Sequence, residues 1–170
     1  MSSMRTDQRG SLILEIIVSA GVLALFTVAI GGIIVANARV VTSANLESRA
    51  IVLARENMEQ VIAIKQSAWS GVALTSPSSK YTMQYVAVPA PHYVMAQDLA
   101  GTGEQIDGFT RTVMMTPGMR DEHNPAKPLS DTGTLRDDNV RKVTVTVTWN
   151  DRGRDRNETL TTYLSNWKGE

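Results

Sequence analysis

The sequence predicts an α+β fold in which one very long N-terminal helix packs on a small antiparallel sheet of three to four strands. An apolar run over residues 10–36 leads directly into a segment whose apolar residues recur at helical spacing. The remainder of the chain contains short runs of β-branched and aromatic residues, which are typical of strands. An amphipathic helix and a sheet with one apolar face can each cover the other.

Length and charge limit the classes of function. The chain has 170 residues, which fits one small domain and an anchor. Its 17 basic and 17 acidic residues balance, and no long basic block is present, so nucleic-acid binding is not expected. The chain contains no cysteine, which excludes disulfides and thiolate metal sites.

The apolar run is long enough to cross a bilayer. Residues 16–35 are all apolar or small, and a helix of about 20 residues spans about 30 Å of hydrocarbon. Arg5 and Arg9 precede the run, so the positive-inside rule places the short leader in the cytoplasm and everything after Arg39 outside. A secretory signal peptide cleaved after Ala38 is the competing interpretation, although its apolar region is usually shorter.

Glu15 interrupts the start of this apolar run. A carboxylate in the membrane costs about 2.5 to 3.5 kcal/mol on insertion scales, so such residues are rare and mark a specific partner. The sequence therefore predicts that Glu15 has a functional role.

The helix is expected to continue from Leu12 to Gln66 without a break, over about 82 Å at about 1.5 Å per residue. The expected inward-facing residues of its amphipathic half are Val40, Ala44, Ile51, Ala54, Met58, Val61 and Ile62, and the expected outward-facing ones are Ser48, Arg49, Arg55, Glu56, Glu59 and Lys65. Ser70 and Gly71 are expected to end the helical pattern.

The strands are expected after residue 80. Predicted strands are 81–88, 109–116, 140–150 and 157–167, with loops over 89–108 and 117–139. The strongest signal is the alternation of valine and threonine from Val143 to Trp149, which gives one apolar and one polar face. Residues 151–156 are short enough to join the last two strands in a hairpin.

Few side chains outside the apolar run suggest chemistry. His92 and His123 stand far apart in expected loops, so both are interpreted as surface residues. Trp69, Trp149 and Trp167 are expected in the core. No catalytic triad, phosphate-binding loop or metal-ligand set can be assembled, so no enzyme, cofactor or metal is expected.

Calcium is the alternative for two acidic stretches of the head. Carboxylate and amide oxygens are calcium ligands, and they occur in two sets, Asn150, Asp151 and Asp155, and Asp137, Asp138 and Asn139. Three arginines interleave the first set and oppose a cation, so a solvated hairpin tip is favoured there.

Residues 9–15, Arg-Gly-Ser-Leu-Ile-Leu-Glu, followed by the long apolar helix, resemble the prepilin signature of type IV pilins and type II secretion pseudopilins. The signature combines a short charged leader, a glycine, a glutamate five residues later and about twenty apolar residues. The later order of long helix, valine-rich strand and final hairpin strand is also similar to these pilin-like subunits.

This resemblance implies a role for three N-terminal residues. Gly10 would be the last residue of a leader, 1–10, removed by a membrane prepilin peptidase that also methylates the new amine of Ser11. Glu15 would pair with the ammonium group of Ser11, on a neighbouring subunit or on its own chain. The mature chain would then comprise an assembly helix over 11–36, its amphipathic half over 37–68 and a β head over 69–170.

The resemblance further implies a structural subunit of a type IV pilus-like filament or of a secretion pseudopilus. Its partners would be other pilin or pseudopilin subunits, the prepilin peptidase, membrane lipid before assembly, and an inner-membrane assembly platform with its ATPase. The head would lie outside the cytoplasm, first beside the inner membrane and then in a filament.

Two departures from the major-subunit pattern favour a minor subunit. Ser11 stands where major subunits commonly carry phenylalanine, and the head lacks their cysteine pair. In addition, Gly31 and Gly32 lie about where many major pilins carry a helix-loosening proline. We expect a helix weak point there, although close packing of small residues against another helix is an equal alternative.

Two interpretations without polymerisation stay open. The chain would be a single-pass anchored protein whose head binds a partner outside the cytoplasm, or a secreted domain released after Ala38.

Overall fold

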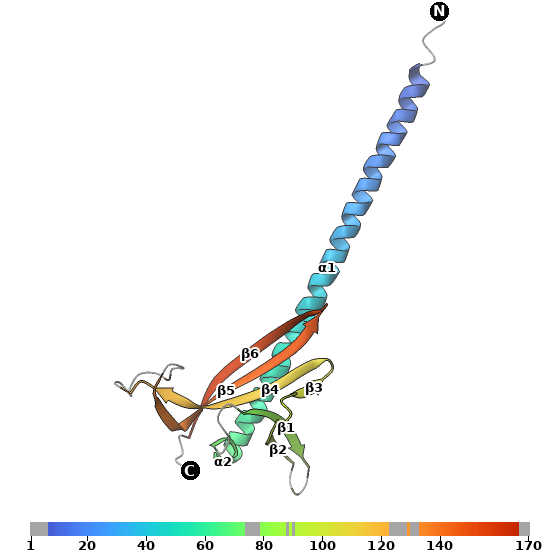
Figure 1. Ribbon diagram of the computed structural model, residues 1–170. Helices are drawn as coiled ribbons and strands as arrows, with labels where there is room; N and C mark the ends of the chain where they lie inside the picture. The colour runs from blue at the N-terminus through green and yellow to red at the C-terminus, as the bar shows by residue number, and fades with distance from the viewer. Residues whose placement is uncertain are drawn as a thin grey trace, which may run out of the picture. The chain divides into compact units, whose positions relative to one another are not determined.

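The computed structural model describes residues 7–73, 79–87, 89, 91–122, 129 and 133–166, with side chains from Leu12 onward. The chain divides into two units, residues 1–45 and residues 46–170. The elements in chain order are α1 (Asp7–Ser67), α2 (Ser70–Ala73), β1 (Lys80–Val86), β2 (His92–Gln97), β3 (Glu104–Ile106), β4 (Phe109–Arg120), β5 (Leu135–Asp151) and β6 (Arg154–Ser165) (Figure 1).

Helix α1 is one continuous element of 61 residues, which confirms the predicted single long helix. Its last turn is closed by two bonds to the carbonyl of Ile64, from the Ser67 hydroxyl at 2.7 Å and from the Ala68 amide at 3.0 Å. A second short helix, α2, occupies the position of the predicted break at Ser70 and Gly71. These residues therefore interrupt α1 but do not end helical structure at once.

The sheet has six antiparallel strands, so the predicted three to four was wrong. Its order is β2-β1-β4-β5-β6, and β3 pairs with β4 beside β1. The two missed strands, β2 and β3, lie in residues 89–108, which were predicted to be loop. They are held by hairpin pairing with β1 and β4, a tertiary effect that outweighs the weak strand signal of these short segments.

The predicted loop over 117–139 was also wrong at both ends. Strand β4 continues to Arg120 and β5 already begins at Leu135. The register shifts between Pro117 and Gly118. Proline is tolerated in a strand at such an irregularity, so Pro117 does not end β4.

The hairpin of β5 and β6 is confirmed, but its turn is shorter than predicted. Asp151 pairs with Arg154, so only Arg152 and Gly153 form the turn. Both have positive φ, 56° and 81°, as a two-residue type I′ turn requires. The amide of Gly153 also donates to the side-chain oxygen of Asn150 at 2.7 Å. The predicted end of the last strand at residue 167 lies outside the described residues.

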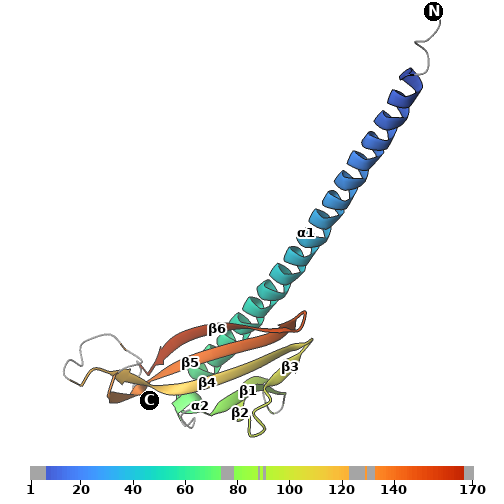
Figure 2. The ribbon, with the colours of Figure 1, turned by 45° about the horizontal axis from the view of Figure 1, so that its top comes forward.

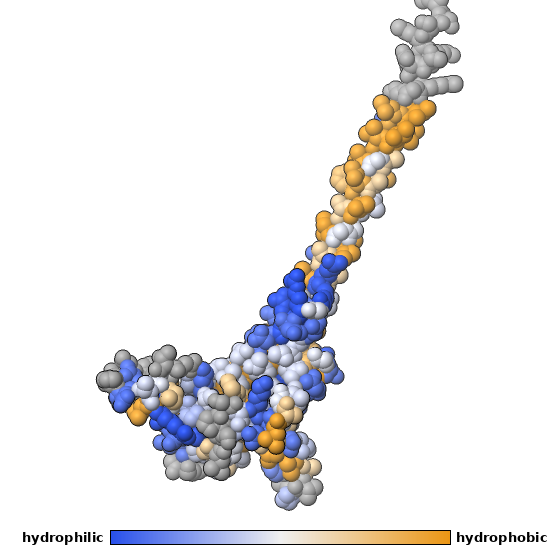
Figure 3. All heavy atoms as spheres, viewed as in Figure 1, coloured by the Kyte–Doolittle hydropathy of each residue, from blue (hydrophilic) through white to orange (hydrophobic). Residues whose placement is uncertain are grey.

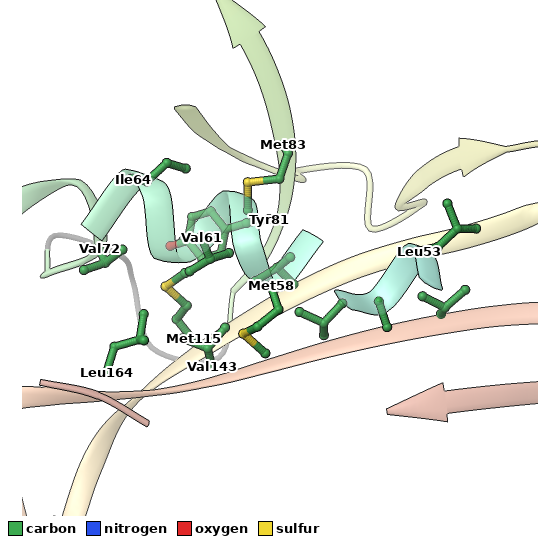
Figure 4. Packing of buried hydrophobic residues seen from close by; sticks show 14 of the residues in the cluster. Leu53, Met58, Val61, Ile64, Val72, Tyr81, Met83, Met115, Val143 and Leu164 are labelled. Atoms are coloured by element: carbon green, nitrogen blue, oxygen red, sulfur yellow. The ribbon is translucent and has the colours of Figure 1, made fainter. Parts of the chain in front are cut away.

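The core of residues 46–170 lies between α1 and one face of the sheet (Figures 2 and 4). Valines 143, 145 and 147 of β5 are fully buried, while the alternating threonines face away from α1. Trp69 and Trp149 are buried, as predicted, and Trp167 is not among the described residues. The helix contributes Ala50, Leu53, Ala54, Met58, Val61 and Ile64 to this core.

The predicted inward face of the helix was wrong in part. Val40 is 67% exposed and Ala44 is also exposed, because both precede the part of α1 that packs on the sheet. Asn57 and Gln60 are buried although they are polar. They share the inward face with the apolar residues, so the position on the helix, rather than the residue type, decides their burial.

Candidate functional site

The apolar part of α1 is the first candidate functional segment. Every described side chain from Leu12 to Thr42 is exposed within the chain. Figure 3 shows that hydrophobic residues cover most of the visible side of this stretch. Among the described residues, α1 is the one helix that is long and apolar enough to cross a membrane. Its Thr27 hydroxyl donates to the carbonyl of Leu23 at 2.9 Å, so this polar group is satisfied within the helix. The segment is therefore suited to an apolar environment.

Glu15 is the only charged residue between Gly10 and Ala36. Its side chain is exposed, and no side chain described in the structure forms an ion pair with it. Ser11 and Glu15 are one helical turn apart, at positions i and i+4, so they lie on the same face of α1. The backbone thus brings the predicted processing site and the predicted assembly residue together.

Gly10 and Ser11 lie within the first turns of α1, which begins at Asp7. Their side chains are outside the part that the structure describes, and their predicted roles in cleavage and methylation stay predictions.

Gly31 and Gly32 do not interrupt α1. A Cβ atom placed on either would meet no atom within 4 Å, so neither glycine is required by a close contact within the chain. They leave a stretch of helix backbone bare of side chains, which suits both expectations made for them, a weak point and close packing against another helix.

A buried arginine organises the head. Arg111 of β4 is 3% exposed and donates to one oxygen of Glu104 in β3, from Nε at 3.0 Å and from Nη2 at 2.7 Å. Its Nη1 lies 3.4 Å from the carbonyl of Leu53 and 3.8 Å from the Glu56 carboxylate, both in α1. Arg111 thus connects β3 and β4 to the helix. The burial of Arg111 was not predictable from the sequence, because an Arg in a strand usually faces water.

A second buried arginine lies near the other end of β4 and β5. Arg141 is 5% exposed and donates to three carbonyls, those of Ala73 at 2.9 Å, Asp138 at 3.1 Å and Val140 at 3.1 Å. Burial lowers the pKa of Arg141, Arg136 lowers it further, and the carboxylate of Asp138 raises it. These bonds fix α2 to β5, which is a structural role.

The acidic residues considered for calcium are engaged by other side chains. The Asp137 carboxylate accepts from Arg120 at 2.7 Å, and that of Asp138 from Arg136 at 2.6 Å. The hydrogen bond from Arg120 lowers the pKa of Asp137. Asp155 accepts from the Asn150 amide at 2.9 Å. No group of three or more His, Cys, Asp or Glu side chains able to hold a metal occurs among the described residues.

Of the two histidines, His92 is the one that the structure describes. His92 begins β2, not a loop as predicted, and is exposed. His123 lies outside the described residues. What the sequence missed in this region is β2 itself, which places an uncharged strand at one edge of the sheet.

Comparisons of the chain with protein-family models, with curated proteins and with solved structures gave no match. The functional assignment therefore depends on the chemistry of the N-terminal segment and on the architecture of the head.

Proposed function

We propose that this chain is a structural subunit of a type IV pilus-like filament or of a type II secretion pseudopilus. The observation that carries the proposal is the combination of Gly10, Ser11 and Glu15 at the start of an exposed apolar helix that continues into an α+β head. Within this proposal, the helix is first a membrane anchor and then part of the filament core.

Within this proposal, an ion pair of Glu15 sets the axial position of each subunit relative to its neighbour. Removal of residues 1–10 creates an ammonium group on Ser11, and this group pairs with a Glu15 carboxylate. In a low-dielectric core an unpaired carboxylate is strongly unfavourable, whereas an ion pair offsets much of its desolvation. Subunits are thereby favoured at the one axial position where the pair forms. Lipid tails and apolar helices solvate the remaining side chains about equally well, so transfer between them needs no large change in hydrophobic free energy.

The experiment compares processing with assembly in the full chain. Gly10→Val should block leader removal, because the peptidase approaches a backbone without a Cβ atom. Glu15→Ala should leave processing intact and reduce recovery in sheared filaments by at least tenfold. The controls are Gln8→Ala in the leader and Ser19→Ala, one turn beyond Glu15, both of which should process and assemble normally. Normal assembly of both test variants would refute the proposal.

The second candidate function is a single-pass anchored protein whose head binds a partner and never polymerises. The exposed apolar helix, taken alone, fits a single-pass anchor as well as it fits a filament subunit. That candidate predicts that Gly10→Val and Glu15→Ala leave both the length of the chain and its function unchanged.

A further inference from the structure

We propose that the two open edges of the sheet, β2 and β6, pair with each other between two copies of this chain, so that neighbouring heads share backbone hydrogen bonds. This pairing rests on the proposed function, because the filament is what brings the copies side by side. Strands β2 and β6 are the two ends of the strand order, and within the described residues each has a strand neighbour on one side only.

The outward backbone groups of β6 follow from its register with β5. The amide of Asn166 donates to the carbonyl of Asn139 at 2.8 Å, so these two residues form a hydrogen-bonded pair. Hydrogen-bonded and non-hydrogen-bonded pairs alternate along an antiparallel ladder. Thr159, Thr161 and Ser165 are therefore in non-hydrogen-bonded pairs, and their N–H and C=O groups point away from β5.

The same alternation applies at β2. The amide of Asp98 donates to the carbonyl of Lys80 at 2.8 Å, which continues the register of β1 and β2. Tyr93 and Met95 then direct their N–H and C=O groups away from β1. Each edge thus presents outward backbone donors and acceptors, at Thr159, Thr161 and Ser165 in β6 and at Tyr93 and Met95 in β2.

Both edges lack the features that usually prevent strand pairing. Natural edge strands are protected by charged side chains, prolines, bulges or short length. In β6 the charged residues end at Glu158, and residues 159–165 carry no charge and no proline. Strand β2 has six residues and contains no Lys, Arg, Asp, Glu or Pro. The registers of β1 with β2 and of β5 with β6 show no shift.

Strand direction fits copies that share one orientation. The order β2-β1-β4-β5-β6 contains five strands, each antiparallel to the next, so β2 and β6 run in the same direction. Copies anchored by the same N-terminal helix point the same way. When two such heads lie side by side, β6 of one copy meets β2 of the next in a parallel arrangement, and their α1-covered faces are on the same side.

Parallel pairing uses the outward groups found on both edges. In a parallel ladder, one residue bonds to the two residues that flank its opposite neighbour. With Thr161 of one copy opposite Val94 of the next, its N–H and C=O reach Tyr93 and Met95. Because the contact joins two different edges, it is heterologous and can repeat along a filament. Such repetition requires several neighbouring copies of this chain in one filament. Edge pairing therefore differs from the expectation of a minor subunit, which would be present in few copies.

Cysteine cross-linking tests this pairing directly, since the natural chain has no cysteine. The sheet register places Val94 and Thr161 on the face that points away from α1. Full-length Val94→Cys and Thr161→Cys chains with different tags are produced together in assembling cells and treated with a short thiol cross-linker. We expect a dimer that carries both tags, and none when either variant is produced alone.

Three cross-linking results would overturn the pairing of β2 with β6. A dimer of Thr161→Cys alone would indicate β6–β6 contact and overturn the proposal, as would the absence of any dimer. Thr146→Cys is the matched control, because it lies on the same face but in β5, away from both edges. Its efficient cross-linking to Val94→Cys would show mere proximity and would also overturn edge pairing.

A proline variant tests the role of the backbone. Thr161→Pro removes an outward N–H but no bond of the β5–β6 ladder, and edge strands tolerate proline at such positions. Thr161→Val keeps the N–H and is the control. The proposed register places Thr159 opposite His92, so in chains that also carry Thr159→Cys the proline should reduce mixed cross-linking to His92→Cys at least fivefold, and the valine should not. If the proline variant fails to fold, the cross-linking of Val94→Cys to Thr161→Cys, without the proline, still tests the proposed pairing.

The mature N-terminus separates this proposal from the proposed function. Filaments of processed chains without the mixed cross-link would refute edge pairing and leave the filament function intact. A mixed cross-link between unprocessed chains in the membrane would refute the filament and leave edge pairing intact.

Discussion

Arg111 and Glu104 form a two-donor hydrogen bond across β4 and β3, with Nε at 3.0 Å and Nη2 at 2.7 Å from the same carboxylate oxygen. The arginine is almost fully buried, whereas the glutamate side chain is 30% exposed. Nearby, Arg49 of α1 pairs with Asp107 and lies over the ring of Phe109, 5.6 Å from its centroid. The β3–β4 hairpin is thus fixed to the helix by charge as well as by apolar packing.

Removing Glu104 should destabilise the head more than removing Arg111. Glu104→Ala leaves the buried guanidinium with the Leu53 carbonyl and the more distant Glu56 carboxylate, and loss of one partner of a buried pair costs about 3 kcal/mol. Arg111→Met keeps most of the packing and leaves a carboxylate that water can reach, so we expect a loss of about 1 kcal/mol. Urea unfolding of the full chain in micelles measures both free energies.

The exposed pair of Arg136 and Asp138 provides the control for this comparison. Its side chains are 53% and 71% exposed, and such pairs contribute about 0.5 kcal/mol or less. Arg136→Met should therefore change the free energy of unfolding very little. Equal losses from Glu104→Ala and Arg136→Met would contradict a special role for burial.

The sequence predicted the elements with strong periodicity and missed those that depend on tertiary pairing. The length of α1 and the β5–β6 hairpin were predictable because the apolar run and the valine–threonine alternation leave few alternatives. Strand β2 was missed because its six residues show no clear alternation and are held by β1. The burial of Arg111 and Asn57 depends on which helix face meets the sheet, which no local pattern fixes. In the candidate site, Glu15 was conspicuous because charge is rare in an apolar run, whereas the open edges became visible only with the strand order.

Stability at acid pH should depend in part on Asp137. Its pKa is lowered from 3.8, first by the hydrogen bond from Arg120, so the folded state holds the charged form more strongly than the unfolded state does. This contribution is present above the unfolded pKa and is lost as the pH falls through the lowered pKa. Asp137→Asn should lower the melting temperature at neutral pH, and this effect should shrink as the pH falls through the lowered pKa of Asp137. A constant difference between the two melting curves over this range would refute the prediction.

The turn between β5 and β6 should be sensitive to its second residue. Gly153 has φ of 81°, which a residue with a Cβ atom adopts only with strain, so Gly153→Ala should cost about 1 kcal/mol. Arg152 has φ of 56°, and asparagine tolerates this region better, so Arg152→Asn should raise the melting temperature. Thermal unfolding of both variants tests the sign of each change, and stabilisation by Gly153→Ala would exclude the described turn.

Replacing Gly31 and Gly32 by alanine should stiffen α1. Each substitution favours a helix by about 1 kcal/mol, and neither new Cβ atom meets another atom of the chain. Amide hydrogen exchange of the full chain in micelles should slow near these residues if they form a weak point. Unchanged exchange together with impaired filament assembly would instead indicate close packing against a neighbouring helix.

The mass of the mature N-terminal peptide tests the central claim most directly. The filament account predicts a chain from the membrane or filament fraction that begins at N-methylated Ser11. A chain that still begins at Met1 would contradict it and indicate a simple anchor, and one that begins at Arg39 would contradict it in favour of a signal peptide.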